Sequence, residues 1–175
     1  MTNKVTLSNY SYLWPQEFEK DRLCILALLG EKVKRIEHVG STSIPGMAAK
    51  PIIDIAVAVE RLTIIDDSAI SLLSQIGFEY VPKEEFPYRL FFRRGEWGKG
   101  THHLHVYEYQ SEDWKNLIWF RDYLIKYPDV AAQYLNLKRE LAEICSDRQT
   151  YTLRKAPFIQ NVIALAKEEF NRNGI

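Results

Sequence analysis

The sequence has no long apolar run and no excess of charge of either sign. Its longest purely apolar stretch, residues 23–29, is far shorter than the roughly 20 residues that a membrane-spanning helix needs. The first residues also lack the apolar core of a signal peptide. The 23 Lys and Arg residues equal the 23 Asp and Glu residues in number, so nucleic-acid binding would need a local basic patch. We therefore expect a cytoplasmic protein with no membrane association and no strong signal for nucleic-acid binding.

Cysteine is scarce as well. Cys24 and Cys145 lie far apart, each within an apolar helical pattern, which favours reduced thiols in the core over a disulfide. A length of 175 residues with 46% hydrophobic residues is typical of one globular unit. The sequence therefore predicts a single domain over 1–175, and no sequence feature reveals its oligomeric state.

Two hydrophobic periods divide the chain. The nearly uninterrupted apolar segment 51–59 predicts a central strand covered on both faces. Further strands are predicted at 34–39, 78–81, 88–94 and 101–109, with a glycine-rich hairpin connection at 95–100. Helices are predicted at 17–29, from an N-cap at Asp67 to Gly77, and from 112 onward with a break at Pro128. This order predicts an α/β (α+β) fold: a mixed, largely antiparallel sheet flanked by helices, with a helical C-terminal third.

The loop between the first two predicted strands carries the most informative residues. It contains Gly40, Ser41, Thr42 and Ser43, and Lys50 follows shortly after. Glycine permits a tight turn and a close backbone approach, and hydroxyls with free N–H groups suit phosphate oxygens. The alternative is that the three hydroxyls only cap a short helix. The loop is not a Walker A motif, because it has no Gly-Lys-Ser or Gly-Lys-Thr.

Asp54 is a carboxylate inside the apolar segment 51–59. Burying a carboxylate without a partner is costly, so we expect a metal ion, a cation or several N–H donors beside it. A structural ion pair is the alternative.

A second group of polar residues follows in the segment 101–109. Strand alternation puts His103, His105 and Tyr107 on one face. With Asp54, the two histidines would form a two-histidine, one-carboxylate set that suits Zn²⁺, Mn²⁺ or Fe²⁺ better than Mg²⁺. The alternative is that one histidine packs in the sheet and the others are solvated. We predict that all three side chains converge beside the turn at 40–41.

The segment 37–57 resembles the GrpB family, a branch of the nucleotidyltransferase superfamily with the polymerase-β-like fold. The resemblance covers nearly the whole chain. Further matches are Trp14, Phe18, 103–106, 120–124, Tyr134, Leu137, Lys138, Tyr151 and Lys155.

The resemblance implies a nucleotidyltransferase-like fold that binds a nucleotide and transfers a nucleotidyl group with two Mg²⁺ ions. Related domains occur fused to dephospho-CoA kinase. The first carboxylate of the superfamily's Asp-x-Asp pair corresponds to Asp54, which would be catalytic. The second position holds Ala56, which cannot ligate a metal, and this departure weakens the expectation of two-metal chemistry.

Basic residues supply further candidates for binding phosphate. Arg89 and Arg93 alternate onto one face of their strand, and Arg93 is the one that we expect to contact phosphate together with Lys50 and the loop. Arg121, Lys138, Arg154 and Lys155 from the helical part could close over the site, although a solvated surface role is the alternative for each.

Two functions are therefore expected from these residues. One is a nucleotidyltransferase-like enzyme that binds a nucleotide or another phosphate-containing small molecule, with Mg²⁺, Mn²⁺ or Zn²⁺ as the metal. The other is a non-catalytic ligand-binding or protein-interaction domain that kept the fold and lost a carboxylate at Ala56.

Overall fold

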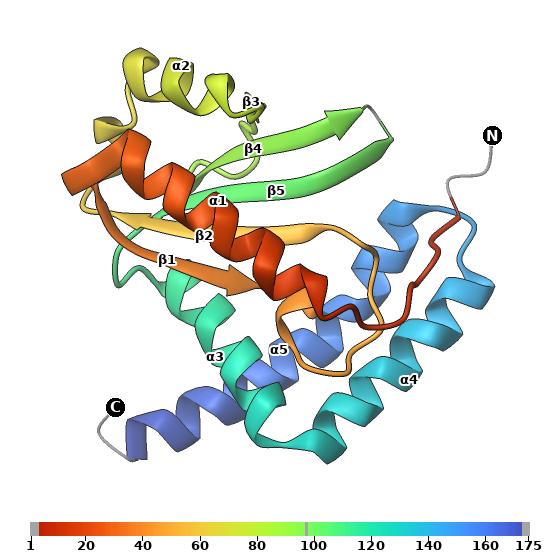
Figure 1. Cartoon of the computed structure of the whole chain (residues 1–175). Helices are drawn as coiled ribbons and strands as arrows, with labels where there is room; N and C mark the ends of the chain where they lie inside the picture. Colours follow the sequence, from red (N-terminus) through yellow and green to blue (C-terminus); the bar gives the residue numbers. More distant parts are fainter. Residues whose placement is uncertain (1–3, 97, 173–175) are drawn as a thin grey trace.

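The computed structural model describes residues 4–96 and 98–172 and contains a five-stranded sheet between two groups of helices (Figure 1). The strands lie in the order β1-β2-β5-β4-β3. Their bounds are β1 Val33–Val39, β2 Ile53–Val59, β3 Glu79–Tyr80, β4 Arg89–Glu96 and β5 Lys99–Glu108. The helices are α1 Leu13–Leu29, α2 Asp67–Gln75, α3 Glu112–Lys126, α4 Pro128–Ile144 and α5 Arg148–Arg172. The predicted α/β class, with helices around the sheet and a helical C-terminal third, is confirmed.

The sheet is antiparallel except at its centre. β1 pairs with β2, β4 with β5, and β3 with β4 in antiparallel register, whereas β2 and β5 run parallel. The parallel pair is possible because α2 and two further strands separate β2 from β5 in sequence, which leaves room for a crossover connection. The expectation of a largely antiparallel sheet is correct, but the carboxylate and histidine strands are joined through its one parallel pair.

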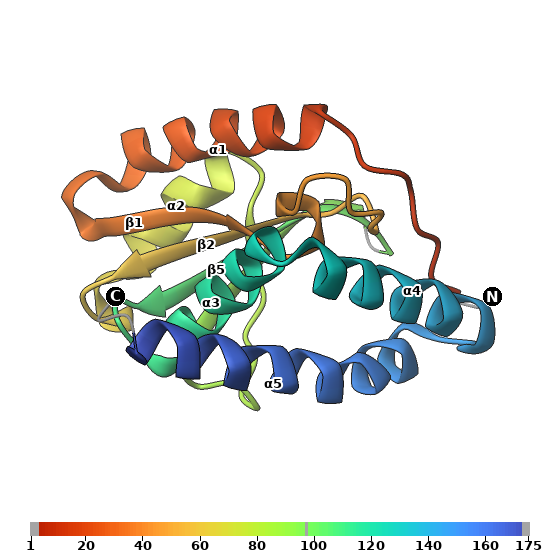
Figure 2. The same ribbon diagram turned by 90° about the horizontal axis from the view of Figure 1, so that it is seen from below.

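The two faces of the sheet carry different cores. Odd-numbered residues of β2 pack with α1 and α2 in one cluster, which includes Ile55 and Val57. The even-numbered Ala56 and Ala58 face the other side of the sheet. There they pack with Tyr107 of β5 and with Trp114 of α3. Figure 2 shows the sheet between α1 on one side and α3 and α5 on the other. This alternation sends Asp54 toward the helical third of the chain.

Several helix ends differ from the sequence prediction. α1 begins at Leu13, four residues before the predicted start, with Pro15 in its first turn. α2 is capped by Asp66 and not by Asp67, because the extended backbone of Asp66 lets its carboxylate accept from Ala69 N at 2.9 Å. The predicted break at Pro128 is confirmed, since α4 begins there.

The two cysteines have different surroundings. Cys145 is buried in a small cluster with Val5, Leu141 and Tyr151, as predicted. Cys24 is exposed, which corrects the expectation of a core thiol, because the neighbouring Ile25 takes the inward position on α1. Both thiols are free. Within the described residues, no helix is long and apolar enough to cross a membrane.

Candidate phosphate pocket beside a carboxylate–histidine cluster

The turn after β1 lies directly against Asp54. Gly40 has φ +71°, a backbone conformation that residues with a side chain rarely adopt. A Cβ at Gly40 would overlap the carboxylate oxygen Oδ2 of Asp54 and lie 3.1 Å from its Cβ. Only glycine therefore lets the turn and the β2 carboxylate approach each other this closely.

Two of the three loop hydroxyls are engaged within the protein. Thr42 is 1% exposed; its Oγ1 donates to the Ile52 carbonyl at 3.3 Å and lies 3.0 Å from Nε2 of His38. Ser43 Oγ donates to the Gly40 carbonyl at 2.6 Å. These contacts hold the 3₁₀ turn at Ser41–Ser43 in shape. Thr42 and Ser43 thus help to build the loop, whereas the Ser41 side chain interacts with Tyr134 and lines the adjoining pocket.

His38 of β1 contacts the same turn through Thr42. Its ring stacks on Phe18 with centroids 4.9 Å apart, and burial lowers its pKa to about 4. A neutral ring can donate one N–H, and the oxygen of Thr42 can accept it because the Thr42 hydroxyl proton goes to Ile52. His38 is therefore a structural residue of the loop.

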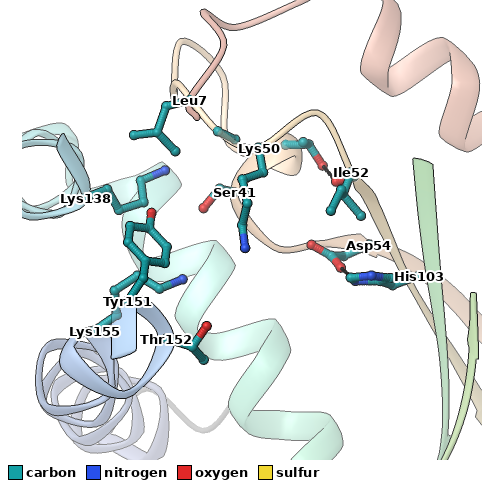
Figure 3. Close-up of a pocket in the computed structure, with 12 residues that line it drawn as sticks. Leu7, Ser41, Lys50, Ile52, Asp54, His103, Lys138, Tyr151, Thr152 and Lys155 are labelled. Carbon is teal, nitrogen blue, oxygen red and sulfur yellow. Dashed lines mark hydrogen bonds and ion pairs between the residues drawn. The ribbon is translucent and has the colours of Figure 1, made fainter. Parts of the chain in front are cut away.

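A pocket of about 280 Å³ opens beside this turn (Figure 3). It brings together residues from the loop, both central strands and the last two helices. The polar residues that line it are Ser41, Thr42, Lys50, Asp54, His103, Lys138, Tyr151, Thr152 and Lys155. In Figure 3, Lys50 lies between the Asp54–His103 pair and the side chains from α4 and α5.

Three lysines give the pocket its charge. Burial and the neighbouring Lys155 lower the pKa of Lys138 to about 7. Burial and the neighbouring Lys50 lower the pKa of Lys155 to about 8. The pKa of Lys50 is lowered too, by burial and by Arg148. In the part of the chain that the structure describes, none of the three ammonium groups has a carboxylate within ion-pair distance.

Three aromatic contacts and one hydrogen bond hold these lysines. Lys138 Nζ lies 5.0 Å from the centroid of the Tyr134 ring. Lys138 is 1% exposed and its Nζ donates to the Ala48 carbonyl at 2.6 Å. The ammonium groups of Lys50 and Lys155 lie 5.4 Å and 4.6 Å from the centroid of the Tyr151 ring, which attracts cations. Burial raises the pKa of Tyr151 to about 12, so its ring stays neutral.

The remaining predicted cations lie elsewhere. Arg93 donates to Glu79 at 3.0 Å and 2.8 Å and does not line the pocket. Arg121 pairs with Glu37 and Asp122, each at 2.7 Å. Arg154 is exposed on α5. The expectation that Arg93 contacts a phosphate in this pocket does not match its position, because Glu79 on the edge strand holds its guanidinium.

Asp54 meets both histidines, as predicted. β2 and β5 pair with Asp54 opposite His103, and Asp54 Oδ1 lies 3.1 Å from His103 Nδ1 and 4.0 Å from His105 Nε2. Burial acts to raise the pKa of Asp54, but the hydrogen bond from His103 and nearby positive charge lower it below its ordinary value. Asp54 is thus an ionised carboxylate surrounded by N–H groups.

His105 has a second neighbour on its outer nitrogen. Arg89 Nη1 lies 3.1 Å from His105 Nδ1, and burial lowers the pKa of His105 to about 4. The Arg89 guanidinium also lies over the ring of Phe86, 4.6 Å from its centroid. His105 is therefore a neutral ring between a carboxylate and a guanidinium.

The site does not fit the two-metal centre that the superfamily resemblance implies. Ala56 is fully buried on the same face as Asp54, so β2 supplies one carboxylate where two-metal sites use several. Among the described residues, the possible ligand cluster adds two histidines and no second carboxylate. Asp54, His103 and His105 offer three ligand atoms within 4.8 Å of one another. Their role as ligands of one transition metal therefore stays a prediction.

A second hollow of about 390 Å³ adjoins the pocket and shares Ser41, Asp54 and Lys155 with it. The other residues that line it are mostly apolar or aromatic: Tyr107, Leu117, Phe120, Tyr134, Ile159 and Ile163, with Gly40, Asp113 and Asn116. The two spaces together could hold a molecule with a charged part and an apolar part.

Tyr151 and Thr152 were not predicted to line the pocket, although Tyr151 was a match to the family. Lys138 and Lys155 were predicted as family matches and as basic residues that could close over the site. All four come from α4 and α5, far from the loop in sequence. The apolar contact of Ile44 and Met47 with Phe120 and Tyr134 brings these helices to the loop. The family resemblance marked Lys138, Tyr151 and Lys155 as matches but gave them no position in space. The apolar residues at 44 and 47 do not say which helix they meet.

Comparison with known proteins places the chain. The model of the family described as GrpB protein matches residues 4–165. The chain belongs to the GrpB family. It is 36% identical over 164 residues to the glutamate-rich protein GrpB of Alkalihalophilus pseudofirmus, covering 91% of this chain and 94% of that protein.

Two further relatives support the assignment. The crystal structure of the conserved protein GrpB from Enterococcus faecalis has a TM-score of 0.86 and 32% identity, covering 94% of this chain and 99% of that one. A dephospho-CoA kinase of Mycolicibacterium paratuberculosis is 27% identical over 175 residues, covering 85% of this chain and 42% of that protein. Sequence similarity to this chain thus occurs both in short chains and in part of a longer protein.

Proposed function

We propose that this protein binds a nucleotide or a related phosphate-bearing small molecule, with the phosphate in the lysine pocket, as a nucleotidyltransferase-like member of its family. The observation that carries this proposal is the convergence of Lys50, Lys138 and Lys155 beside Ser41, where no carboxylate among residues 4–96 and 98–172 pairs with any of them. Like charges repel and burial disfavours their charged forms, which is why the pKa values fall. A bound anion would attract the three ammonium groups, offset their mutual repulsion and raise their pKa values again.

The second hollow could hold the organic part of the ligand. Its aromatic and aliphatic walls suit a ring or a chain, and Ser41, Asp54 and Lys155 lie where the two spaces meet. A free phosphate would fill only the lysine pocket. We therefore expect an organic phosphate to bind more tightly than inorganic phosphate.

Asp54 and His103 form a carboxylate–histidine pair that could accept a proton where the lysine pocket meets the second hollow. An ionised carboxylate accepts only, so His103 Nδ1 donates to Asp54 and its Nε2 can accept a proton. The pairing of a carboxylate with one ring nitrogen fixes the ring and makes the other nitrogen the basic one. In this proposal His103 removes the proton of an acceptor hydroxyl as its oxygen attacks the α-phosphorus of a bound nucleoside triphosphate. The bond from that phosphorus to the bridging oxygen breaks, and pyrophosphate leaves with its charge neutralised by the lysines. Asp54 acts as the positioning carboxylate.

Ala56 favours the second candidate function, a ligand-binding domain without turnover. The buried methyl group stands where a second carboxylate would be needed for metal-assisted transfer. Both candidates share the phosphate pocket and differ in whether the bound molecule is chemically changed. Incubation of a bound nucleotide with the protein, followed by chromatography of the products, separates them.

Calorimetry with pyrophosphate and ATP tests the shared part of the proposal. Replacing Ser41→Ala and Lys50→Ala together removes one hydroxyl and one charge from the pocket but no core residue. A hydrogen bond to a charged group contributes about 1.5–3 kcal/mol, so binding should weaken about tenfold or more. Lys20→Ala on the exposed part of α1 is the matched control and should leave affinity unchanged. Equal binding by the parent and the double variant, or no binding by the parent, would contradict the proposal.

A further inference from the structure

Arg89 determines which nitrogen of His105 carries the proton. A guanidinium has N–H donors and no acceptor. The contact of 3.1 Å between Arg89 Nη1 and His105 Nδ1 is therefore a hydrogen bond only if Nδ1 accepts. The ring proton must then sit on Nε2, and a doubly protonated ring could not make this contact at all.

The nitrogen that keeps its proton is the one that a metal would need. His105 Nε2 faces Asp54 Oδ1 at 4.0 Å, so an ion shared with Asp54 would take its lone pair. A histidine that binds a metal usually donates its other N–H to a carboxylate, a carbonyl or water. At His105 the partner of the nitrogen that faces away from Asp54 is Arg89, which donates a hydrogen bond. A metal-binding histidine would instead need an acceptor at this nitrogen.

Arg89 is held in this position by its surroundings. Its guanidinium lies over Phe86 at 4.6 Å and near Phe91 at 5.9 Å. Its Nε is buried with no hydrogen-bond acceptor among the described residues, an arrangement that costs free energy. A change in the His105 tautomer would leave a second Arg89 donor without an acceptor, so the guanidinium and the tautomer are linked.

We propose that Arg89 prevents the Asp54–His103–His105 cluster from binding a transition metal, and that the neighbouring pocket holds its anion through N–H and ammonium donors alone. The first half of this proposal, the exclusion of a metal by Arg89, does not depend on the proposed function. The second half, anion binding without a metal, rests on it. Both nitrogens that face Asp54 carry protons, and the three lysines supply the positive charge that metal ions supply in other phosphate sites.

The matched variants are Arg89→Gln and Arg93→Gln. The amide oxygen of a glutamine at 89 can accept from Nδ1–H and so permits the metal-binding tautomer of His105. Arg93 lies on the same strand and face but pairs with Glu79, which makes it the control. Arg89→Met is a second variant that removes the donor without adding an acceptor.

Two measurements on tag-free protein test the first half. The chain has four histidines, so long-range ¹H–¹⁵N spectra can assign each ring. We expect the Nε2–H form of His105 in the parent and in Arg93→Gln. Calorimetric titration with Zn²⁺ should show binding at least tenfold tighter in Arg89→Gln than in either.

Three results would overturn the first half. One is an Nδ1–H tautomer of His105 in the parent, which needs no variant to fold. Another is Zn²⁺ binding by the parent that shifts both His103 and His105 resonances. The third is a folded Arg89→Gln and Arg89→Met pair that binds Zn²⁺ no better than Arg93→Gln.

Pyrophosphate titrated into the parent with and without EDTA tests the second half. Equal affinity in both supports anion binding without a metal, and binding that EDTA abolishes overturns it. No binding in either condition overturns the proposed function and leaves the tautomer result standing by itself.

Discussion

At Gly40, two separate effects act against any side chain. The positive φ strains every residue other than glycine, and the carboxylate of Asp54 occupies the space that a Cβ would need. Gly46 has a similar φ of +76° but nothing within 4 Å of its Cβ position. The two glycines therefore separate backbone strain from steric overlap.

We predict that Gly40→Ala destabilises the protein by more than Gly46→Ala. Backbone strain at a positive φ costs a residue with a side chain roughly 1–3 kcal/mol, and forced displacement of a packed group adds about 1–3 kcal/mol. The free energy of unfolding, measured with urea, should fall by the first amount for Gly46→Ala and by the sum for Gly40→Ala. Equal losses would show that Asp54 moves freely and that the turn does not press on it.

The sequence predicted the strand-borne half of the site well. Strand periodicity placed His103 and His105 on one face, and the apolar surroundings of Asp54 required a partner. Both arguments depend on local alternation, which a single strand fixes. Thr42 and Ser43 were harder, because a hydroxyl in a turn serves a ligand and the backbone equally well until its neighbours are known.

Among the secondary-structure elements, α4 and α5 bring the lysines that the sequence could not place. A helix presents its residues in space according to the helices that it packs against. Lys138 follows Tyr134 by one turn, and Tyr134 packs against Phe120 of α3. Nothing in the heptad-like spacing of α4 distinguishes a lysine that reaches Ala48 from one that reaches solvent.

Lys138 should make stability depend on pH. Its pKa is about 7 in the folded protein and about 10.4 in an unfolded chain. Between these values the unfolded state binds more protons, so the free energy of unfolding rises with pH from about 7 to about 10. Below this window the folded state carries the full cost of the buried charge.

Lys138→Met removes this dependence. We expect the slope of unfolding free energy against pH to fall by up to about 1.4 kcal/mol per pH unit between pH 7 and 10, measured by urea denaturation across that range. Lys20→Met, which changes an exposed lysine, should keep the parental slope. A parental slope in Lys138→Met would mean that Lys138 keeps an ordinary pKa.

At the scale of the whole molecule, the sheet separates a face with a buried ion-pair network from the face that carries the candidate site. On the first face, Asp21 of α1 binds Arg94 at 2.7 Å and 2.6 Å and lies 3.1 Å from His102 Nε2. On the second, Asp54 and His103 face the helical third. Because His102 and His103 are consecutive on β5, strand alternation alone assigns one to structure and the other to the site.

Three lysines gather in one pocket of a molecule that is neutral overall. The formal net charge is zero, yet the pocket gathers three lysines around one carboxylate. The proposed anion binding would therefore depend on the local geometry of the pocket, and we expect the affinity to change when those lysines lose their protons.

We predict that anion binding takes up protons and weakens as pH rises through the pKa of Lys155, which is about 8. An anion beside the ammonium group raises that pKa, so the complex binds more protons than the free protein does near pH 8. By linkage, affinity then falls with increasing pH.

Sulfate is a suitable probe because it stays doubly charged from pH 6 to 9.5. Calorimetry at pH 8 in two buffers of different ionisation enthalpy should show proton uptake, and the dissociation constant should increase several-fold from pH 7 to 9. Lys155→Met should bind more weakly at pH 7 and lose much of the uptake. Affinity that is independent of pH in the parent would mean that the three lysines stay fully charged in the free pocket and that burial does not prepare them for an anion.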